Sequence, residues 1–346
     1  DKSHGCFEGD LVLREDRDAR TRYGVFADQY TDWPVWVRLS NGVGHTQADS
    51  VLDVRGFAMK LMGVSGVKMM DDEQETQDFL FVSTPSSAGK NAEEFMGVVD
   101  AGMRGKGALL RYAFGKPRTV LAPITRAKGV DSMISAQYWS GAAFHLGAHQ
   151  AVKMTVKSCE PYENSPDKSN PDYLRVDLVK AIESDICFTF YVQLQVDPKR
   201  TPIENASVVW ETEISPEIPV ADVYLRKQDF DNSVRDEFCE SLSFNPWHGI
   251  SAHQPMGNQN RARRYIYNAS QGHRGKSVEP TAPEIVEKEE PIEYCDFETK
   301  KSECIDQMVQ IKGSTPNMVM NHSMILSPIG NDSVQSYLDV GDSQWI

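Results

Sequence analysis

An arginine and a tyrosine late in the chain have the spacing and the chemistry of an iron site. Arg263 and Tyr267 stand four residues apart in a run, 260–270, whose pattern predicts a helix. Positions i and i+4 lie one above the other on a helix, so the guanidinium can reach the tyrosine hydroxyl. A positive charge there favours phenolate over phenol, and phenolate is a hard anionic ligand that suits ferric iron. The pair therefore predicts an iron site.

The same spacing also has an ordinary explanation, because arginine and tyrosine four residues apart occur by chance in chains of this length. Arg261 and Tyr265 form a second such pair in the same run. Tyr265 and Tyr267 are about 200° apart around a helix, so only one of them can point inward. We expect Asn258 to cap the start of this helix and Gly272 to end it.

A predicted strand in WPVWVRLSNG, which begins at Trp33, carries polar side chains that could face such a site. Alternation places its valines and its leucine on one face, and Arg38 and Ser40 on the other. Exposure to solvent would explain both polar residues. A guanidinium also suits a carboxylate, however, and a hydroxyl suits an imidazole nitrogen.

Several segments of the chain together resemble the catalase-like haem proteins. The most specific similarity is DVRGFAMK, Asp53 to Lys60, which nearly matches a stretch of catalases. In that family a helix carries an arginine, the iron-ligating tyrosine four residues later, and a propionate-binding arginine seven residues beyond it. Arg263, Tyr267 and Arg274 hold those places here. The segments PWHG, AHQP and NRAR resemble a shorter branch of the family that includes allene oxide synthase-like enzymes.

The resemblance implies heme b (ferric iron) bound between a β-barrel and the ligand helix. Tyr267 would be the axial metal ligand, with Arg263 on its oxygen. Arg38 and Arg274 would bind the haem propionates, and Ser40 would serve catalysis by orienting a distal histidine. An axial phenolate stabilises ferric over ferrous iron, which favours reaction with peroxides over binding of dioxygen.

The distal side of such a site matches the family only in part. In KSHGCF, Lys2, Gly5 and Phe7 fit the family's distal strand, which places the distal histidine one residue before Asp1. Either the domain is truncated at its N-terminus, as we expect, or the protein lacks this histidine. His4 is the local alternative. We interpret it as a rim or surface histidine.

Catalases also carry an asparagine before the strand that corresponds to 78–85. No asparagine stands at 75–77, although Gln77 could donate a similar amide hydrogen bond. This departure argues against full catalase activity. Within DVRGFAMK, we expect Asp53 and Arg55 to form a structural ion pair.

Long alternating segments without regularly spaced helices predict an antiparallel sheet or barrel and argue against a doubly wound fold. The resemblance implies an α+β fold, an antiparallel β-barrel of the catalase type with flanking helices. Residues 92–116 have helical spacing. Their predicted apolar face consists of Phe95, Val98, Val99, Met103 and Leu109. The predicted strands are 7–15, the segment from Trp33, 78–85, 187–196, 206–212 and 221–226.

Charge divides the chain into two parts. Residues 275–346 carry 13 acidic and 5 basic side chains, a net −8 of the chain's −14. Such a composition buries little, so we expect a partly disordered acidic tail after a catalase-like haem domain at 1–274. The net negative charge argues against nucleic acid and against an anionic membrane surface as partners.

The 346 residues contain six cysteines without zinc-like spacing, which indicates reduced thiols rather than a disulfide framework. No apolar run approaches the roughly 18 residues of a transmembrane helix. We therefore expect a soluble protein in a reducing compartment such as the cytoplasm, and leave a homo-oligomer open.

Three functions fit these observations. The first is a haem oxidoreductase, a catalase or peroxidase that cleaves the O–O bond of hydrogen peroxide or small organic peroxides. The second is a fatty-acid hydroperoxide isomerase or allene oxide synthase-like enzyme, which would need a wide apolar channel for a lipid hydroperoxide. The third is a haem-binding protein without enzymatic activity, favoured if the distal histidine is absent.

Overall fold

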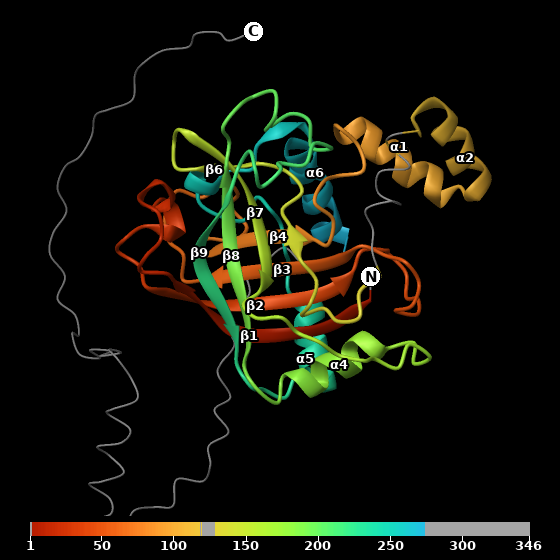
Figure 1. Cartoon of the computed structure of the whole chain (residues 1–346), viewed down its shortest axis with the longest axis horizontal. Helices are drawn as coiled ribbons and strands as arrows, with labels where there is room; N and C mark the ends of the chain where they lie inside the picture. Colours follow the sequence, from red (N-terminus) through yellow and green to blue (C-terminus); the bar gives the residue numbers. More distant parts are fainter. Residues whose placement is uncertain (1, 118, 120–128, 274–346) are drawn as a thin grey trace, which may run out of the picture. The chain divides into compact units, whose positions relative to one another are not determined.

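The computed structural model describes residues 2–117, 119 and 129–273. Eight antiparallel strands close into a barrel in the order β1-β2-β3-β4-β5-β7-β8-β9, with β9 paired back to β1 (Figure 1). A further short strand, β6, pairs with β7. The predicted antiparallel barrel is confirmed. The strands are β1 (Ser3–Leu13), β2 (Asp32–Asn41), β3 (Arg55–Met62), β4 (Thr76–Val82), β5 (Tyr138–Trp139), β6 (Phe144–Leu146), β7 (Gln150–Ser158), β8 (Ile186–Leu194) and β9 (Glu217–Leu225).

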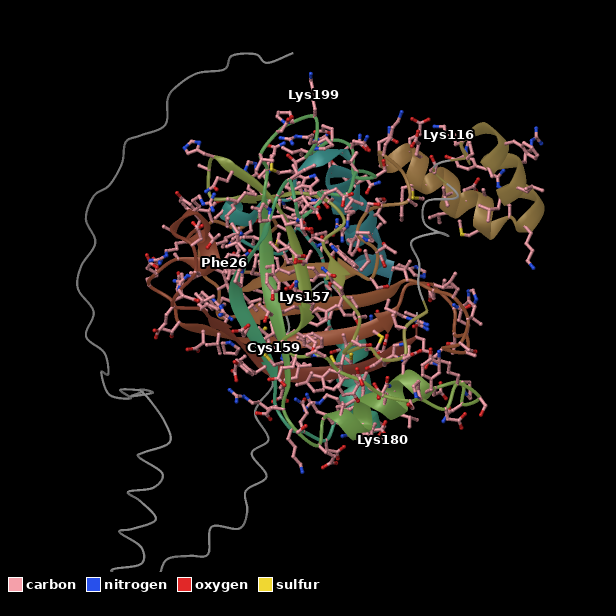
Figure 2. The ribbon with its side chains drawn as sticks, viewed as in Figure 1. Phe26, Lys116, Lys157, Cys159, Lys180 and Lys199 are labelled. Carbon is pink, nitrogen blue, oxygen red and sulfur yellow. A yellow bond between two sulfur atoms is a disulfide. The ribbon has the colours of Figure 1, made fainter. Side chains whose placement is uncertain are left out.

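Aromatic rings fill the interior of the barrel, because alternation sends every second residue of each strand inward. Phe57 packs edge-on against Phe188, and Phe79 against Phe190, each with ring centroids 5.3 Å apart. Phe26, labelled in Figure 2, joins them at 5.4 Å from Phe190. Such ring pairs contribute about 0.5–1.5 kcal/mol each beyond their buried area. The interior is therefore a packed core, and the outward faces of the strands are where a ligand can bind.

Helices flank the barrel, and asparagines begin two of them. The Asn91 side chain accepts from the Glu94 N–H at the start of α1, and Asn232 accepts from the Arg235 N–H at the start of α5. None of the described helices combines the length and the apolarity needed to cross a membrane. The helices are α1 (Ala92–Met103), α2 (Lys106–Gly115), α4 (Tyr173–Ala181), α5 (Ser233–Ser241) and α6 (Gly257–His273), with single 3-10 turns at Ala19–Thr21, Gly24–Phe26 and Ser251–His253.

The predicted apolar face of residues 92–116 was wrong. The run is broken into two helices at Gly105, whose φ of +102° strongly favours glycine. Phe95 and Met103 are 41% and 75% exposed, whereas Glu94 is buried. Glu94 takes the buried place because its carboxylate accepts from the Lys116 ammonium at 2.9 Å.

The strand predicted at 206–212 was also wrong, since this segment forms turns. Ala206 and Trp210 are buried, as the alternating pattern suggested, but they are not part of a strand. The Ala206 N–H donates to the Lys90 carbonyl at 3.0 Å, and the Trp210 carbonyl accepts from the Gln193 amide at 2.9 Å. These hydrogen bonds satisfy the backbone without a strand partner.

The prediction that the cysteines are reduced thiols was wrong for one pair. Cys159, directly after β7, and Cys187, in β8, form a disulfide. They lie opposite each other, with the Cys159 N–H 3.0 Å from the Cys187 carbonyl oxygen. Cys6 and Cys239 are free and buried, and the other two cysteines lie outside the described residues.

Asp53 and Arg55 do not form the expected ion pair. The Arg55 guanidinium donates to the Asn41 side chain and, at 2.7 Å, to the Asp49 carbonyl. Asp53 instead accepts from its neighbour's backbone, the Val54 N–H, at 2.7 Å.

Candidate functional site

Helix α6 brings Arg263 and Tyr267 together as predicted. The Arg263 Nη2 donates to the Tyr267 hydroxyl at 3.3 Å, and the guanidinium lies 5.2 Å from the centre of the tyrosine ring. Nη1 donates at 3.0 Å to the Asn260 side chain, whose own amide donates to the Ala143 carbonyl. Asn260 is fully buried, so its hydrogen bond fixes the position of the Arg263 guanidinium.

The second arginine–tyrosine pair of α6 is not formed. Arg261 makes two hydrogen bonds to Glu204, at 3.0 and 2.8 Å, and Tyr265 is 75% exposed. Of the two tyrosines, Tyr267 is half-buried and Tyr265 lies on the exposed face of α6. Asn258 lies one residue inside the helix rather than before it, and its side chain accepts from the Ala92 N–H at the start of α1.

Arg38 and Ser40 lie on the outward face of β2, as the alternation predicted. Arg38 donates to the Glu240 carboxylate of α5 at 3.2 Å, so its guanidinium does bind a carboxylate in this chain. Ser40 is buried at the end of the strand, opposite Ser3 of β1 and Gly56 of β3. Arg38 and Ser40 are thus neighbours on the outward face of the same strand.

The neighbouring strands continue this face with small and apolar side chains. Gly56 and Ala58 of β3 pair with the two polar residues of β2, and Val82 and Leu80 of β4 pair with them in turn. None of these four is fully buried. A Cβ at Gly56 would lie 3.0 Å from the Ser40 Oγ, so a larger residue here would crowd the serine hydroxyl. This face therefore combines apolar and small side chains with a guanidinium, which can bind a carboxylate, and a hydroxyl, which can bind an imidazole nitrogen.

His4 is not the rim or surface histidine that the sequence predicted. It is fully buried, and its Nε2 lies 2.7 Å from the Asn41 Oδ1. The strand register shifts between Ser3 and Gly5, and this irregularity turns His4 to the barrel end where Asp49 lies 3.9 Å away. Burial lowers the pKa of His4.

Gln77 does not take the role that we considered for it, the donation of an amide hydrogen bond in place of the asparagine of catalases. It shares the inward face of β4 with Phe79 and is buried. Its Oε1 accepts from the Ile250 N–H at 3.0 Å, and its amide nitrogen donates to the Asp78 carbonyl at 3.2 Å. The side chain is therefore on the opposite side of the sheet from Arg38 and Ser40.

A buried charged cluster that sequence reasoning missed lies beside this face. Lys60 of β3 forms ion pairs with Glu73 and, at 2.7 Å, with Asp78 of β4; all three side chains are at most 1% exposed. Burial by itself would lower the pKa of Lys60, but the two carboxylates outweigh it and raise that pKa. Thr76 adds a hydrogen bond to Glu73 at 2.5 Å.

His248 joins this cluster to helix α6. Its Nδ1 lies 3.1 Å from the Asp78 carboxylate, and its Nε2 lies 2.9 Å from the Asp72 carboxylate. Burial would lower the pKa of His248, but the hydrogen bonds to Asp72 and Asp78 raise it to about 9. Gln271, one turn beyond Tyr267, lies 3.2 Å from Nε2 and accepts from Asn245 at 2.9 Å. The cluster thus fixes the end of the helix that carries the tyrosine.

Part of this cluster was visible in the sequence. Alternation in DVRGFAMK turns Lys60 outward with Ala58, and a lysine in so apolar a strand signals a buried partner. Glu73 and Asp72 come from a segment without periodicity, so their approach follows only from the fold. Glu73, Asp78 and His248 are close enough to hold a metal ion. The Lys60 ammonium already neutralises two of them, which makes the cluster a structural anchor.

Comparison with known proteins gives a likeness of structure alone. No family model matches the sequence, and no curated protein matches it. Catalase A from Saccharomyces cerevisiae superposes with a TM-score of 0.63 and 15% identity, over 97% of this chain and 75% of that one. The fold is of the catalase type. A fungal catalase gives a TM-score of 0.62 and 16% identity, over 96% of this chain and 72% of that one.

A bacterial catalase superposes with a TM-score of 0.61 and 17% identity, over 80% of this chain. The chain spans 56% of the length of that catalase. Among the described residues, the catalase-type fold thus carries the Arg263–Tyr267 pair on α6 and the Arg38–Ser40 pair on β2. Arg274 and the predicted tail at 275–346 lie outside the described residues.

Proposed function

We propose that this chain binds ferric haem b and acts on peroxides. The observation that carries the proposal is the Arg263–Tyr267 pair, with the guanidinium 3.3 Å from the hydroxyl on a helix whose neighbouring turns are anchored by buried residues. The guanidinium is placed to hydrogen-bond the oxygen of a tyrosinate that ligates ferric iron. The catalase-type barrel and the apolar outward face of β3 and β4 support the same conclusion.

Each residue has a distinct task in this proposal. Bound there, ferric haem would supply the redox centre for cleaving a peroxide O–O bond. Tyr267 would ligate the iron, and Arg263 would stabilise the negative charge of its oxygen. Arg38 would exchange Glu240 for a propionate, and Arg274 would bind the other. Ser40 would orient a distal imidazole, which would move the proton from one peroxide oxygen to the other.

A second candidate substrate, a fatty-acid hydroperoxide, is favoured by the surface of α1 and α2. The two helices leave apolar side chains in solvent that could contact an acyl chain, and the most exposed are Met103 at 75% and Phe114 at 84%. Exposed apolar surface of this kind commonly marks a binding surface. On this proposal, lipid hydroperoxide is converted without release of oxygen.

The replacement Tyr267→Phe tests the proposal. We expect the full chain, incubated with hemin, to show a ferric haem spectrum with tyrosinate character, and the variant to lose or alter it. Tyr265→Phe is the matched control, because that tyrosine lies two residues away, is exposed and has no arginine on it. Its spectrum should equal that of the parent chain.

Two further measurements decide the outcome. Oxygen release from hydrogen peroxide supports the catalase reading, and consumption of a fatty-acid hydroperoxide without oxygen supports the second substrate. Haem uptake without either activity leaves a haem-binding protein. If the chain takes up no haem, or if both tyrosine variants give the parent spectrum, the ligand assignment is wrong.

A further inference from the structure

The Cys159–Cys187 disulfide is open to solvent in a hollow of about 660 Å³. Cys159 is exposed and Cys187 is half-buried, and both line the hollow together with Tyr191 and Tyr224. Cys159 follows Lys157 along the wall of the barrel (Figure 2). A dithiol can therefore approach the sulfur atoms without any change of fold. Exposed disulfides are more easily reduced than buried ones.

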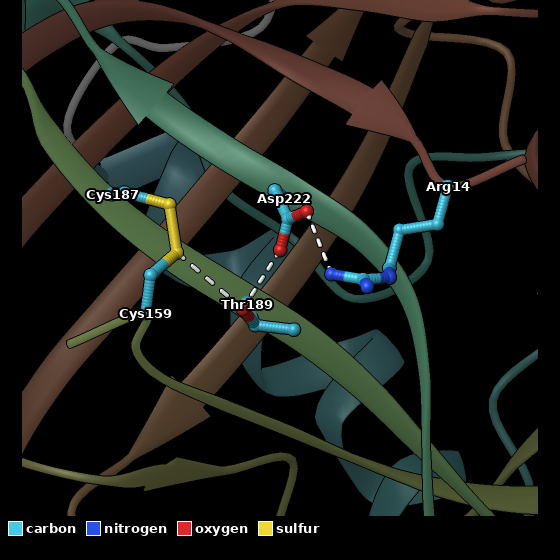
Figure 3. The surroundings of a disulfide bond; sticks show 5 residues. All are labelled: Arg14, Cys159, Cys187, Thr189 and Asp222. Carbon is cyan, nitrogen blue, oxygen red and sulfur yellow. Dashed lines mark hydrogen bonds and ion pairs between the residues drawn. A yellow bond between two sulfur atoms is a disulfide. The ribbon is translucent and has the colours of Figure 1, made fainter. Parts of the chain in front are cut away.

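A chain of polar groups ends on one of the two sulfur atoms. The Thr189 hydroxyl lies 3.4 Å from the Cys159 Sγ and donates to Asp222 at 2.7 Å (Figure 3). The other oxygen of Asp222 accepts from Arg14 at 3.0 Å. Since the threonine hydrogen is used by Asp222, the lone pairs of its oxygen face the sulfur. A disulfide sulfur has no hydrogen to give them, whereas a reduced thiol does.

We propose that Cys159 and Cys187 form a reversible redox site that a dithiol reductant opens. A thiolate of the dithiol attacks the exposed Cys159 sulfur, the disulfide bond breaks, and Cys187 leaves as a thiolate that takes a proton. The second thiol of the reductant then attacks the mixed disulfide, and Cys159 is released. Two electrons and two protons pass to the cysteine pair, and the dithiol becomes a disulfide. The Cys159 thiol donates its hydrogen to Thr189.

The redox state of this site controls the freedom of helix α4. The disulfide closes the segment between Cys159 and Cys187, which contains α4. At the start of α4 the Leu174 N–H donates to Asp49 at 3.0 Å, and Asp49 also binds Lys2 at 2.6 Å. Reduction removes the covalent closure and leaves the pairing of β7 and β8 to hold the ends of the segment, so we expect the amides of α4 to exchange faster with solvent. This effect does not depend on haem.

The experiment uses the full chain in its oxidised form. Free thiols are first blocked with N-ethylmaleimide, the protein is equilibrated with reduced and oxidised dithiothreitol in varied ratio, and new thiols are trapped with isotope-labelled maleimide and located by mass spectrometry. Circular dichroism follows the fold, and hydrogen exchange follows α4. We expect Cys159 and Cys187 to be labelled together while the barrel stays folded, with faster exchange in α4.

The variant Thr189→Val removes the acceptor for the Cys159 thiol and keeps the branched shape. We expect it to shift the equilibrium about fivefold toward the disulfide, the effect of one net hydrogen bond. Thr155→Val is the matched control, because Thr155 is a buried threonine that donates to a carboxylate, Glu217 at 2.9 Å, away from the disulfide. If the pair opens only when the barrel unfolds, or if α4 exchanges equally in both states, the redox site is refuted. If the two variants behave alike, the role of Thr189 is refuted.

Discussion

Replacing Lys60 with methionine is expected to lower the free energy of unfolding by about 3–5 kcal/mol. The Lys60 ammonium is fully buried, paired with Glu73 and 2.7 Å from Asp78. Methionine fills the space of the lysine stem but leaves Glu73 and Asp78 in the protein interior with His248 as their remaining cationic partner. Removing one partner of a buried ion pair is costly because the remaining charge has lost its solvation by water. Denaturant-induced unfolding of the full chain measures the change.

Lys157→Met is the control for this prediction. Lys157 also pairs with a carboxylate, Glu217 at 2.7 Å, but its side chain is 38% exposed. A pair in contact with water contributes at most about 1 kcal/mol. Equal losses in the two variants would show that burial of the Lys60 cluster contributes nothing beyond an ordinary surface pair.

The parts of the fold that the sequence predicted well are those set by local periodicity. Alternation placed Arg38 and Ser40 outward on β2, and helical spacing brought Arg263 to Tyr267, because both depend only on neighbours along one element. The prediction of a strand at 206–212 was wrong for a related reason. The alternating pattern there arises because Trp210 is buried, and a side chain can be buried without its backbone pairing with another strand.

The remainder of the site depends on which segments the fold makes neighbours. Cys159 and Cys187 form a disulfide because β7 and β8 are adjacent in a register that sets them opposite each other. His4 is buried because β1 is irregular at its first residues, which no alternating pattern indicates. His248 and Asp72 are 176 residues apart in the sequence, and only the fold brings them together. Contacts of this kind lie beyond any single element and could not be read from the sequence.

The stability of the fold should fall by about 3 kcal/mol as pH rises from 6.5 to 9. The pKa of His248 is raised in the folded chain to about 9, from an ordinary 6.5. A raised pKa means that the folded state binds the proton more tightly, so the stabilisation is complete below pH 6.5. It is lost as pH rises through 9, where the imidazole between Asp72 and Asp78 becomes neutral in the folded state too. The free energy of unfolding, measured across this range, should follow that curve.

The variant His248→Gln isolates the contribution of this histidine. Glutamine can still hydrogen-bond Asp72 or Asp78 but carries no titrating charge, so the difference in stability between the parent and the variant should shrink as pH rises. Burial lowers the pKa of His253 to about 4, so that histidine is neutral in the folded chain across this range. Its unfolded form, with an ordinary pKa of about 6.5, is neutral above roughly pH 7.5, so His253 adds no slope from there to pH 9. A parent and a variant whose stabilities fall in parallel would contradict the prediction. Since His248 also contacts Gln271, one turn beyond Tyr267, the same titration should loosen the end of α6. The protection factors of the amides in that turn, which correct for the intrinsic rise of exchange with pH, should fall over the same pH range.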